Sequence, residues 1–259
     1  MTRPPPPPRP RRDWAYFLDL DGTLARIAPT PEAAALDEGM GATLARLVAA
    51  TGGAVALISG RPLAEVDRLL APLSIAAAGL HGLERRGASG RTARARAAPA
   101  ALARLRPALA KFARAHPGCL LEDKGPALAL HFRGAPASEA AAAALVDGLL
   151  ARDGRGLVLQ RGKKVLEIRA AGDDKGAAIR RFMAEPPFRG RVPVFAGDDA
   201  TDEDGFAVVN AMGGVSVRVG ASPTTCARFA VASVAALRRW LGRVVAGDGE
   251  SRGAAAGGS

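Results

Sequence analysis

The feature that most constrains this chain is a short apolar segment that ends at two carboxylates. Residues 16–18 are apolar, and Asp19 and Asp21 follow them two positions apart, directly before Gly22. A run of this kind is typical of a buried parallel strand, and open α/β sheets bind their ligands at the carboxyl ends of such strands. Both carboxylates then leave the strand toward the same side. A strand followed by a solvated Asp-Gly turn is the alternative that this pattern alone leaves open.

The chemistry of the two carboxylates points to a metal ion and an anionic substrate. Two carboxylates at one strand end repel each other unless a cation lies between them, and oxygen-only donors suit Mg²⁺ better than a soft transition metal. One aspartate can attack phosphorus while the other exchanges protons with the leaving group and then with water, which gives a two-step displacement through an aspartyl-phosphate. Gly22 allows a tight turn, and Thr23 offers a hydroxyl and an N–H to phosphate oxygens.

The segments on either side of this motif predict a parallel sheet. Apolar runs alternate with segments of helical periodicity, and this alternation is typical of βαβ units. The predicted strands further along the chain span residues 54–58, 75–78, 191–196 and 214–219. The predicted helices span residues 36–50, 63–70 and 173–183, one that ends at 211, and 233–245. We therefore predict an α/β fold with a Rossmann-like, doubly wound parallel sheet as its core domain, over residues 13–84 and 171–246.

Residues 85–170 follow a different pattern and predict an inserted domain. A helix followed by a hairpin occurs twice, with helices over 97–116 and 136–152 and strand pairs at 119–123 with 127–133 and 157–160 with 165–169. In the second strand of each pair, apolar residues alternate with polar ones, so one face packs on the helices and the other is polar. We predict an α+β cap domain made of two helix-plus-hairpin repeats, with its polar face toward the active site.

Composition narrows the class of protein. No apolar run approaches the ~20 residues that a membrane-spanning helix needs, and residues 1–12 lack the apolar segment of a secretory signal. The two cysteines, Cys119 and Cys226, are too few for a disulfide framework and match no metal-ligand spacing. We therefore expect a soluble cytoplasmic protein with no membrane partner. The Pro/Arg tail 1–12 is expected to be extended and disordered, because a proline run cannot make ladder hydrogen bonds, and the Gly/Ala-rich tail 247–259 is expected to be disordered too.

The net charge of +11 at pH 7 leaves one alternative from another class, a basic nucleic-acid-binding protein on the same fold. Such a protein usually gathers its basic residues and stacks aromatic side chains on bases. Here the arginines are scattered and aromatic residues make up only 4% of the chain. We expect no nucleic-acid partner. A monomer is favoured, with the oligomeric state left open.

Further polar groups follow other predicted strands or open predicted helices. Ser59 offers a neutral donor, Lys175 a cation, and the acidic cluster at 198–204 can complete a metal site. Taken singly, each has an ordinary explanation: a turn, a solvated lysine, or favourable charge at a helix amino terminus. Together with Asp19 and Asp21, they supply the nucleophile, acid/base, metal site and phosphate donors that phosphoryl transfer needs.

This order of motifs resembles the haloacid dehalogenase-like hydrolase superfamily over about residues 14–240. The resemblance implies that Asp19 is the nucleophile and Asp21 the general acid/base. It also implies a Mg²⁺ site of Asp19, Asp198 and the Asp21 carbonyl, with Asp202 reaching the metal through a water. The expected phosphate-binding residues are Leu20, Gly22, Thr23, Ser59, Gly60, Arg61 and Lys175.

Four segments of the sequence show a more specific resemblance, to the trehalose-6-phosphate phosphatase family. They are Ile58-Ser59-Gly60-Arg61, residues 79–84, residues 197–204, and the cap pattern Glu122-x-Lys124-x-x-x-Leu128-x-x-His131-x-Arg133. This resemblance implies that Glu122, Lys124 and Glu167 bind sugar hydroxyls. It implies a Mg²⁺-dependent phosphatase that converts a small-molecule sugar phosphate, trehalose 6-phosphate, to trehalose and phosphate. One departure is Ala170, where the family usually has proline. A phosphatase for another sugar phosphate, with the same core, is the alternative within the enzyme class.

Overall fold

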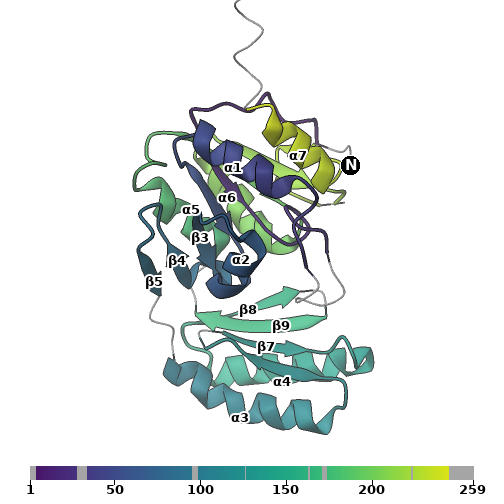
Figure 1. Cartoon of the computed structure of the whole chain (residues 1–259). Coiled ribbons are helices and arrows are strands. Elements are labelled where there is room, and N and C mark those ends of the chain that lie inside the picture. Colours follow the sequence, from purple (N-terminus) through teal and green to yellow (C-terminus); the bar gives the residue numbers. More distant parts are fainter. Residues whose placement is uncertain are drawn as a thin grey trace, which may run out of the picture.

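The computed structural model describes residues 4–27, 34–94, 99–125, 127–162, 164–170, 174–222 and 224–244. It contains two sheets. The larger has eight strands in the order β12-β11-β10-β1-β2-β3-β4-β5, and the smaller has four in the order β6-β7-β9-β8. Figure 1 shows the larger sheet and its helices above the smaller sheet, with β8 and β9 nearest the junction. Among the described residues, no helix is both long and apolar enough to cross a membrane.

The centre of the larger sheet is β1 (Trp14–Leu18), which pairs in parallel with β10 (Val192–Gly197) on one side and β2 (Val55–Ile58) on the other. Every residue of β1 and β2 is buried, which explains why these strands read as continuous apolar runs in the sequence. The parallel sheet continues with β3 (Ala76–Gly79), β11 (Val215–Val219) and β12 (Phe229–Val231). The predicted α/β fold with a largely parallel sheet is confirmed. The strand order reverses at β1, and such a switch point is where doubly wound sheets bind ligands.

Helices cover both faces of this sheet (Figure 1). On one face α1 (Met40–Ala50), α2 (Leu63–Leu70) and α7 (Val234–Gly242) contribute to one core cluster. On the other face α5 (Lys175–Met183) and α6 (Glu203–Ala211) contribute to a second cluster. There the Phe17 ring lies 5.5 Å from that of Phe188 and 6.0 Å from that of Phe182, centroid to centroid. The helix predicted from residue 36 begins only at Met40.

The antiparallel hairpin of β4 (Glu84–Arg86) and β5 (Thr92–Arg94) extends the core sheet at the β3 edge. The predicted start of the cap at residue 85 therefore lies inside a hairpin of the core sheet. The sequence did not reveal these strands because each has only three residues and they carry four arginines, Arg85, Arg86, Arg91 and Arg94, in or between them. An ion pair between Arg94 and Glu84 joins the two strands. Strand β12, also three residues long, was not predicted either.

The smaller sheet and two helices form the cap. Helices α3 (Pro99–Ala115) and α4 (Glu139–Asp153) alternate with the strand pairs β6 (Leu120–Asp123) with β7 (Ala127–His131), and β8 (Leu157–Gly162) with β9 (Val165–Ala170). The described residues also include three 3₁₀ turns, Leu80–Gly82, Pro136–Ser138 and Ala200–Asp202. The apolar side chains of β7 and β9 pack with those of α3 and α4, as the alternation predicted. The predicted helix starts at 97 and 173 and the helix end at 245 lie outside the described residues.

The amino-terminal segment differs from the prediction. Residues 4–12 contain no helix or strand, but they lie against the core and are hydrogen-bonded to it. The Pro5 carbonyl accepts from Ala230 N at 2.9 Å, and the Pro8 carbonyl accepts from Trp240 Nε1 at 2.8 Å. Prolines have carbonyls that accept hydrogen bonds even though they lack an N–H, so a proline run can still be fixed by donors from elsewhere in the chain. Residues 1–3 and 247–259, also predicted to be disordered, lie outside the described residues.

We expect deletion of residues 1–8 to lower the free energy of unfolding by about 1–3 kcal/mol, because two hydrogen bonds to the core are lost. Urea denaturation of the full-length and shortened chains measures this difference. A shorter deletion of residues 1–6, which removes the bond to the Pro5 carbonyl but keeps the bond from Trp240 Nε1 to the Pro8 carbonyl, is expected to lose less. Equal stability of the full-length and shortened chains would show that the segment contributes nothing to the fold.

Candidate active site

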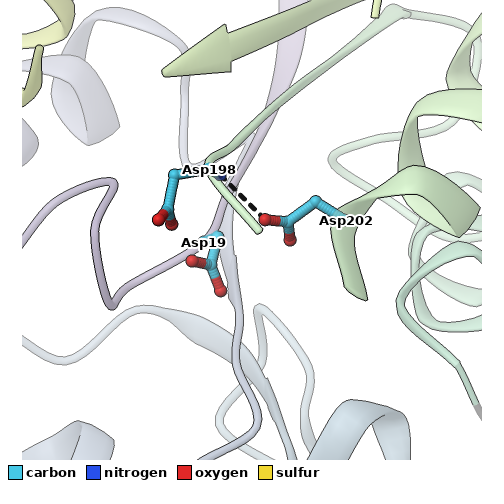
Figure 2. Close-up of side chains that lie close together, drawn as sticks. All are labelled: Asp19, Asp198 and Asp202. Atoms are coloured by element: carbon cyan, nitrogen blue, oxygen red, sulfur yellow. Dashed lines mark hydrogen bonds between the residues drawn. The ribbon is translucent and has the colours of Figure 1, made fainter. Parts of the chain in front are cut away.

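Three carboxylates meet at the carboxyl end of the central strands (Figure 2). Asp19 follows β1, Asp198 follows β10, and Asp202 closes the turn Ala200–Asp202. One ligand atom from each lies within 4.8 Å of the others. Asp202 Oδ2 accepts hydrogen bonds from the backbone N–H groups of Asp198 at 2.8 Å and Asp199 at 2.9 Å, which fixes the loop after β10. The predicted convergence of sequence-distant aspartates is observed.

Lys175 connects two of these carboxylates. It is the first residue of α5, and its Nζ donates to Asp19 Oδ1 at 2.7 Å and to Asp202 Oδ1 at 2.6 Å. All three side chains are buried, so each charge depends on its partners. Burial by itself lowers the pKa of Lys175, but the two carboxylates outweigh this effect and raise the pKa. The ammonium therefore stays charged.

Two of these carboxylates, Asp19 and Asp198, lie in an environment that disfavours their charged forms. Burial, together with repulsion by Asp202 and Asp199, raises the pKa of Asp198 to about 6. Burial also raises the pKa of Asp19, with Asp202 and Asp198 adding to the shift and Lys175 opposing it. Titratable groups perturbed in this way are characteristic of functional sites. A divalent cation among the carboxylates would favour their charged forms.

The residues present fit a Mg²⁺ ion. The donors are oxygen atoms of carboxylates, which a hard cation prefers. Gly22 has a φ of +80°, and a Cβ there would lie 2.1 Å from Asp198 Oδ2, so only glycine lets this turn approach the carboxylate. Thr23 Oγ1 donates to Asp198 Oδ1 at 3.2 Å. The turn that follows β1 is thereby joined to the carboxylate that follows β10.

The side chain of Asp21 lies outside this three-carboxylate cluster. Arg61 binds both of its oxygens, Nε to Oδ2 at 2.7 Å and Nη2 to Oδ1 at 2.8 Å. Arg61 Nη1 also donates to Glu65 Oε2 at 2.9 Å. The prediction that Asp21 contributes to the metal site therefore concerns its backbone carbonyl and not its carboxylate.

The other predicted phosphate-binding residues lie in the turn after β1, in the loop after β2 and at the start of α5. The Leu20 carbonyl accepts the N–H groups of Thr23, Leu24 and Ala25 and so shapes the turn. Ser59, buried after β2, accepts from Arg61 N at 3.1 Å. A cavity of about 270 Å³ is lined by Asp19, Asp21, Gly60, His81, Gln160, Gly162, Val165, Glu167, Lys175, Asp199 and Thr201. A larger cavity of about 520 Å³, lined by Arg9–Asp13, Arg243 and Val244, contains none of the predicted site residues.

The predicted sugar-binding residues lie on the polar face of the cap sheet and face this region. Lys124 Nζ donates to Glu167 Oε2 at 2.8 Å, and His131 Nε2 lies 2.9 Å from Glu122 Oε2. A neighbouring cavity of about 250 Å³ is lined by Asp21, Gly60, Arg61, Pro62, Glu65, His81, Glu122, Lys124 and His131. Core residues and cap residues therefore share the walls of both cavities.

Two residues at this site had no role in the sequence analysis. His81 lines both cavities. Glu84 is buried, accepts from Leu63 N at the start of α2 at 2.8 Å, and pairs with Arg94. Both belong to the segment 79–84, in which glycines at 79 and 82 flank Leu80 and His81. Glycines that flank a histidine were the available signal, because they indicate a backbone shaped for close approach.

Comparisons with known proteins agree with this geometry. Residues 17–235 match the family described as trehalose-phosphatase. The trehalose-6-phosphate phosphatase of Escherichia coli (strain K12) is 43% identical over 228 residues, which cover 88% of this chain and 85% of that protein. A probable trehalose-phosphate phosphatase of Sinorhizobium fredii (strain NBRC 101917 / NGR234) is 43% identical over 227 residues, which cover 87% of this chain and 85% of that protein.

A solved structure supports the fold. The C-terminal domain of the C. albicans trehalose-6-phosphate phosphatase superposes with a TM-score of 0.81 at 21% identity, covering 94% of this chain and 98% of that one. The family match spans most of both sheets and includes Asp19, Lys175 and Asp198. This chain belongs to the trehalose-phosphatase family.

Proposed function

We propose that this chain is a Mg²⁺-dependent phosphatase that hydrolyses trehalose 6-phosphate to trehalose and phosphate through an aspartyl-phosphate. The observation that carries the proposal is one cavity whose walls combine Asp19 and Lys175 of the core with Glu167 of the cap. An enzyme that hydrolyses a sugar phosphate needs a nucleophile, a fixed cation and a carboxylate that binds sugar hydroxyls. A cytoplasmic location and a monomeric state stay predictions.

In the first step Asp19 attacks phosphorus. Lys175 occupies Asp19 Oδ1, so Oδ2 is the atom that we expect to form the new bond. The bond between phosphorus and the sugar oxygen breaks, and Asp21 supplies the proton that this oxygen needs to leave as a hydroxyl. Held between Asp19 and Asp202, the Lys175 ammonium orients the nucleophile and offers positive charge to the phosphate oxygens.

In the second step water attacks phosphorus and the bond to Asp19 breaks. Asp21, now deprotonated, accepts the proton from this water, which returns both aspartates to their starting states. Ser59, Gly60 and the N–H groups of the turn at 22–23 are the expected donors to the remaining phosphate oxygens. Mg²⁺, held by Asp19, Asp198 and the Asp21 carbonyl, would neutralise charge on the phosphoryl group.

The pairing of Arg61 with Asp21 fits this cycle. A guanidinium that binds both oxygens fixes the orientation of the Asp21 carboxylate. A phosphate dianion competes for the same guanidinium, because arginine binds phosphate in the same bidentate manner. Arrival of substrate would therefore draw Arg61 away from Asp21 and free its carboxylate for the leaving oxygen.

The role of Asp202 follows from its hydrogen bonds. One of its oxygens is bound by Lys175 and the other by two backbone N–H groups. These bonds make Asp202 an orienting group for Lys175 and for the loop that carries Asp198. Its expected link to the metal is therefore indirect, through a water.

The Asp19→Asn variant tests the nucleophile. An amide is a far weaker nucleophile than a carboxylate, so kcat for trehalose 6-phosphate should fall by at least about a thousandfold while the fold is kept. Phosphate release and thermal unfolding measure the two properties. The matched control is Asp153→Asn in the cap, where the carboxylate pairs with exposed Arg152, and it should leave activity unchanged. Substantial turnover by a purified Asp19→Asn protein is the result that this mechanism does not allow.

Metal removal tests the carboxylate cluster. Dialysis against EDTA should abolish phosphate release, and Mg²⁺ should restore it, because the charges of Asp19 and Asp198 need a cation beside the substrate dianion. Calcium should bind but support poor turnover, since it accepts less regular geometry. Full activity in the continued presence of EDTA would exclude a metal at this site.

Alanine at Glu122 or Glu167 tests the role of the cap. Each change should lower kcat/KM for trehalose 6-phosphate by roughly ten- to a thousandfold, the effect of one or two lost charge-assisted hydrogen bonds. Hydrolysis of a small aryl phosphate should hardly change, because such a substrate has no sugar hydroxyls. The control is Glu139→Ala at the start of α4, an exposed cap glutamate paired with Lys164. Equal losses on both substrates would place Glu122 and Glu167 in the fold or the phosphate site instead.

A further inference from the structure

The backbone at His81 holds an uncommon conformation. Leu80 and His81 have φ values of 49° and 58°, in the left-handed region that residues other than glycine rarely adopt. Two hydrogen bonds maintain it, from Leu80 N to the Arg61 carbonyl and from His81 N to the Ser59 carbonyl, each 3.0 Å long. Strained residues of this kind persist where the surrounding structure determines them, and they cluster at functional sites.

This backbone places the imidazole directly over Gly60. A Cβ on Gly60 would lie 2.7 Å from His81 Nε2, so the ring occupies space that any other residue at position 60 would fill. The His81 side chain is only 8% exposed. It reaches the junction of core and cap, where it lines both cavities. Packing alone does not explain a strained backbone that directs a polar ring to this junction.

On the other side of the junction, Glu167 has an open acceptor. Its Oε2 accepts from Lys124 at 2.8 Å, but its Oε1 is buried and has no hydrogen-bond partner among the described residues. His81 Nε2 lies 3.4 Å from this Oε1. A buried carboxylate oxygen left in this state costs free energy, and a ligand hydroxyl that donates to it removes the cost.

The charge state of His81 suits such a ligand. Burial lowers the pKa of His81 below its ordinary value, and the cations Lys175, Arg169 and Lys124 lower it further. The ring is therefore neutral and has one donor and one acceptor nitrogen. Adjacent hydroxyls of a sugar ring lie close together, so one can donate to Glu167 Oε1 while its neighbour bonds to the imidazole.

We propose that His81 is a sugar-binding residue of the core, which together with Glu167 holds two adjacent hydroxyls of the phosphorylated glucose ring. The proposal rests on the proposed function, because it names a further contact of the same substrate. It makes the core contribute to sugar specificity, and not only to phosphate binding. His81, which contacts Ser59 and Gly60, thus connects the phosphate loop to the sugar.

The His81→Asn variant tests this role. Asparagine adopts the left-handed conformation more readily than most residues, so the turn is kept, but its side chain is too short to replace the imidazole. We expect kcat/KM for trehalose 6-phosphate to fall by about ten- to a hundredfold, and that for an aryl phosphate to change by less than about threefold. The matched control is His116→Asn, where the ring bonds the Phe112 carbonyl within the cap, and both substrates should be unaffected.

A double variant tests the partnership with Glu167. If both side chains hold the same sugar ring, the losses from His81→Asn and Glu167→Gln should not multiply, because the second change removes contacts that the first has already weakened. Binding of trehalose 6-phosphate to the Asp19→Asn protein, with and without His81→Asn, gives a second readout without turnover. There the dissociation constant should rise by about tenfold or more.

Several outcomes would overturn the proposal. An unchanged ratio of kcat/KM for the two substrates would remove the role of His81 in sugar binding. If both values fall equally, His81 belongs to the phosphate loop alone. Losses that multiply in the double variant would also remove its role in sugar binding. A wild-type enzyme with no preference for trehalose 6-phosphate over an aryl phosphate would overturn the proposed function as well. A clear wild-type preference that His81→Asn leaves intact would overturn only the assignment of His81.

Discussion

The ion pair network of Lys175 with Asp19 and Asp202 is the interaction on which the rest of the site depends. It joins the end of β1, the start of α5 and the turn after β10, and all three side chains are buried. Removal of Lys175 would leave two buried carboxylates without their cation, which strongly disfavours the folded state, whereas an amide at position 19 leaves Lys175 paired with Asp202. Because α5 is also the first core helix after the cap, the same contact fixes where the chain returns from the cap to the core.

A division of labour between the two parts of the chain follows from this arrangement. Under the proposed function, the core would present fixed charges and N–H groups to the phosphate, and the cap sheet would present carboxylates and a lysine to the sugar. Neither part has a complete site, since both cavities take walls from each. His81 and the loop after β2 lie where the two meet, and Glu84 holds that loop by accepting from the first N–H of α2. Specificity and chemistry are thus coupled through a few contacts at one junction.

The sequence predicted the features that depend on local pattern. The buried strands β1 and β2, the helix α2 and the two cap hairpins follow from apolar runs, periodicity and turn residues, and the ends of parallel strands brought Asp19 and Asp198 together as expected. Features that depend on distant partners were missed. Donors near residues 230 and 240 hold the amino-terminal segment, and the bidentate pairing of Asp21 with Arg61 joins two separate loops. The imidazole position of His81 depends on a backbone conformation that residue types alone do not specify.

The central claim is that phosphate is transferred to Asp19 before water releases it. The most direct measurement is rapid acid quenching of the enzyme during turnover of trehalose 6-phosphate, followed by peptide mass spectrometry. The account predicts one phosphoryl group on the Asp19 carboxylate in the quenched wild-type enzyme, at a level that rises and decays within the time course of turnover. A phosphoryl group on any other residue, or turnover with none on Asp19 at any time, would contradict it.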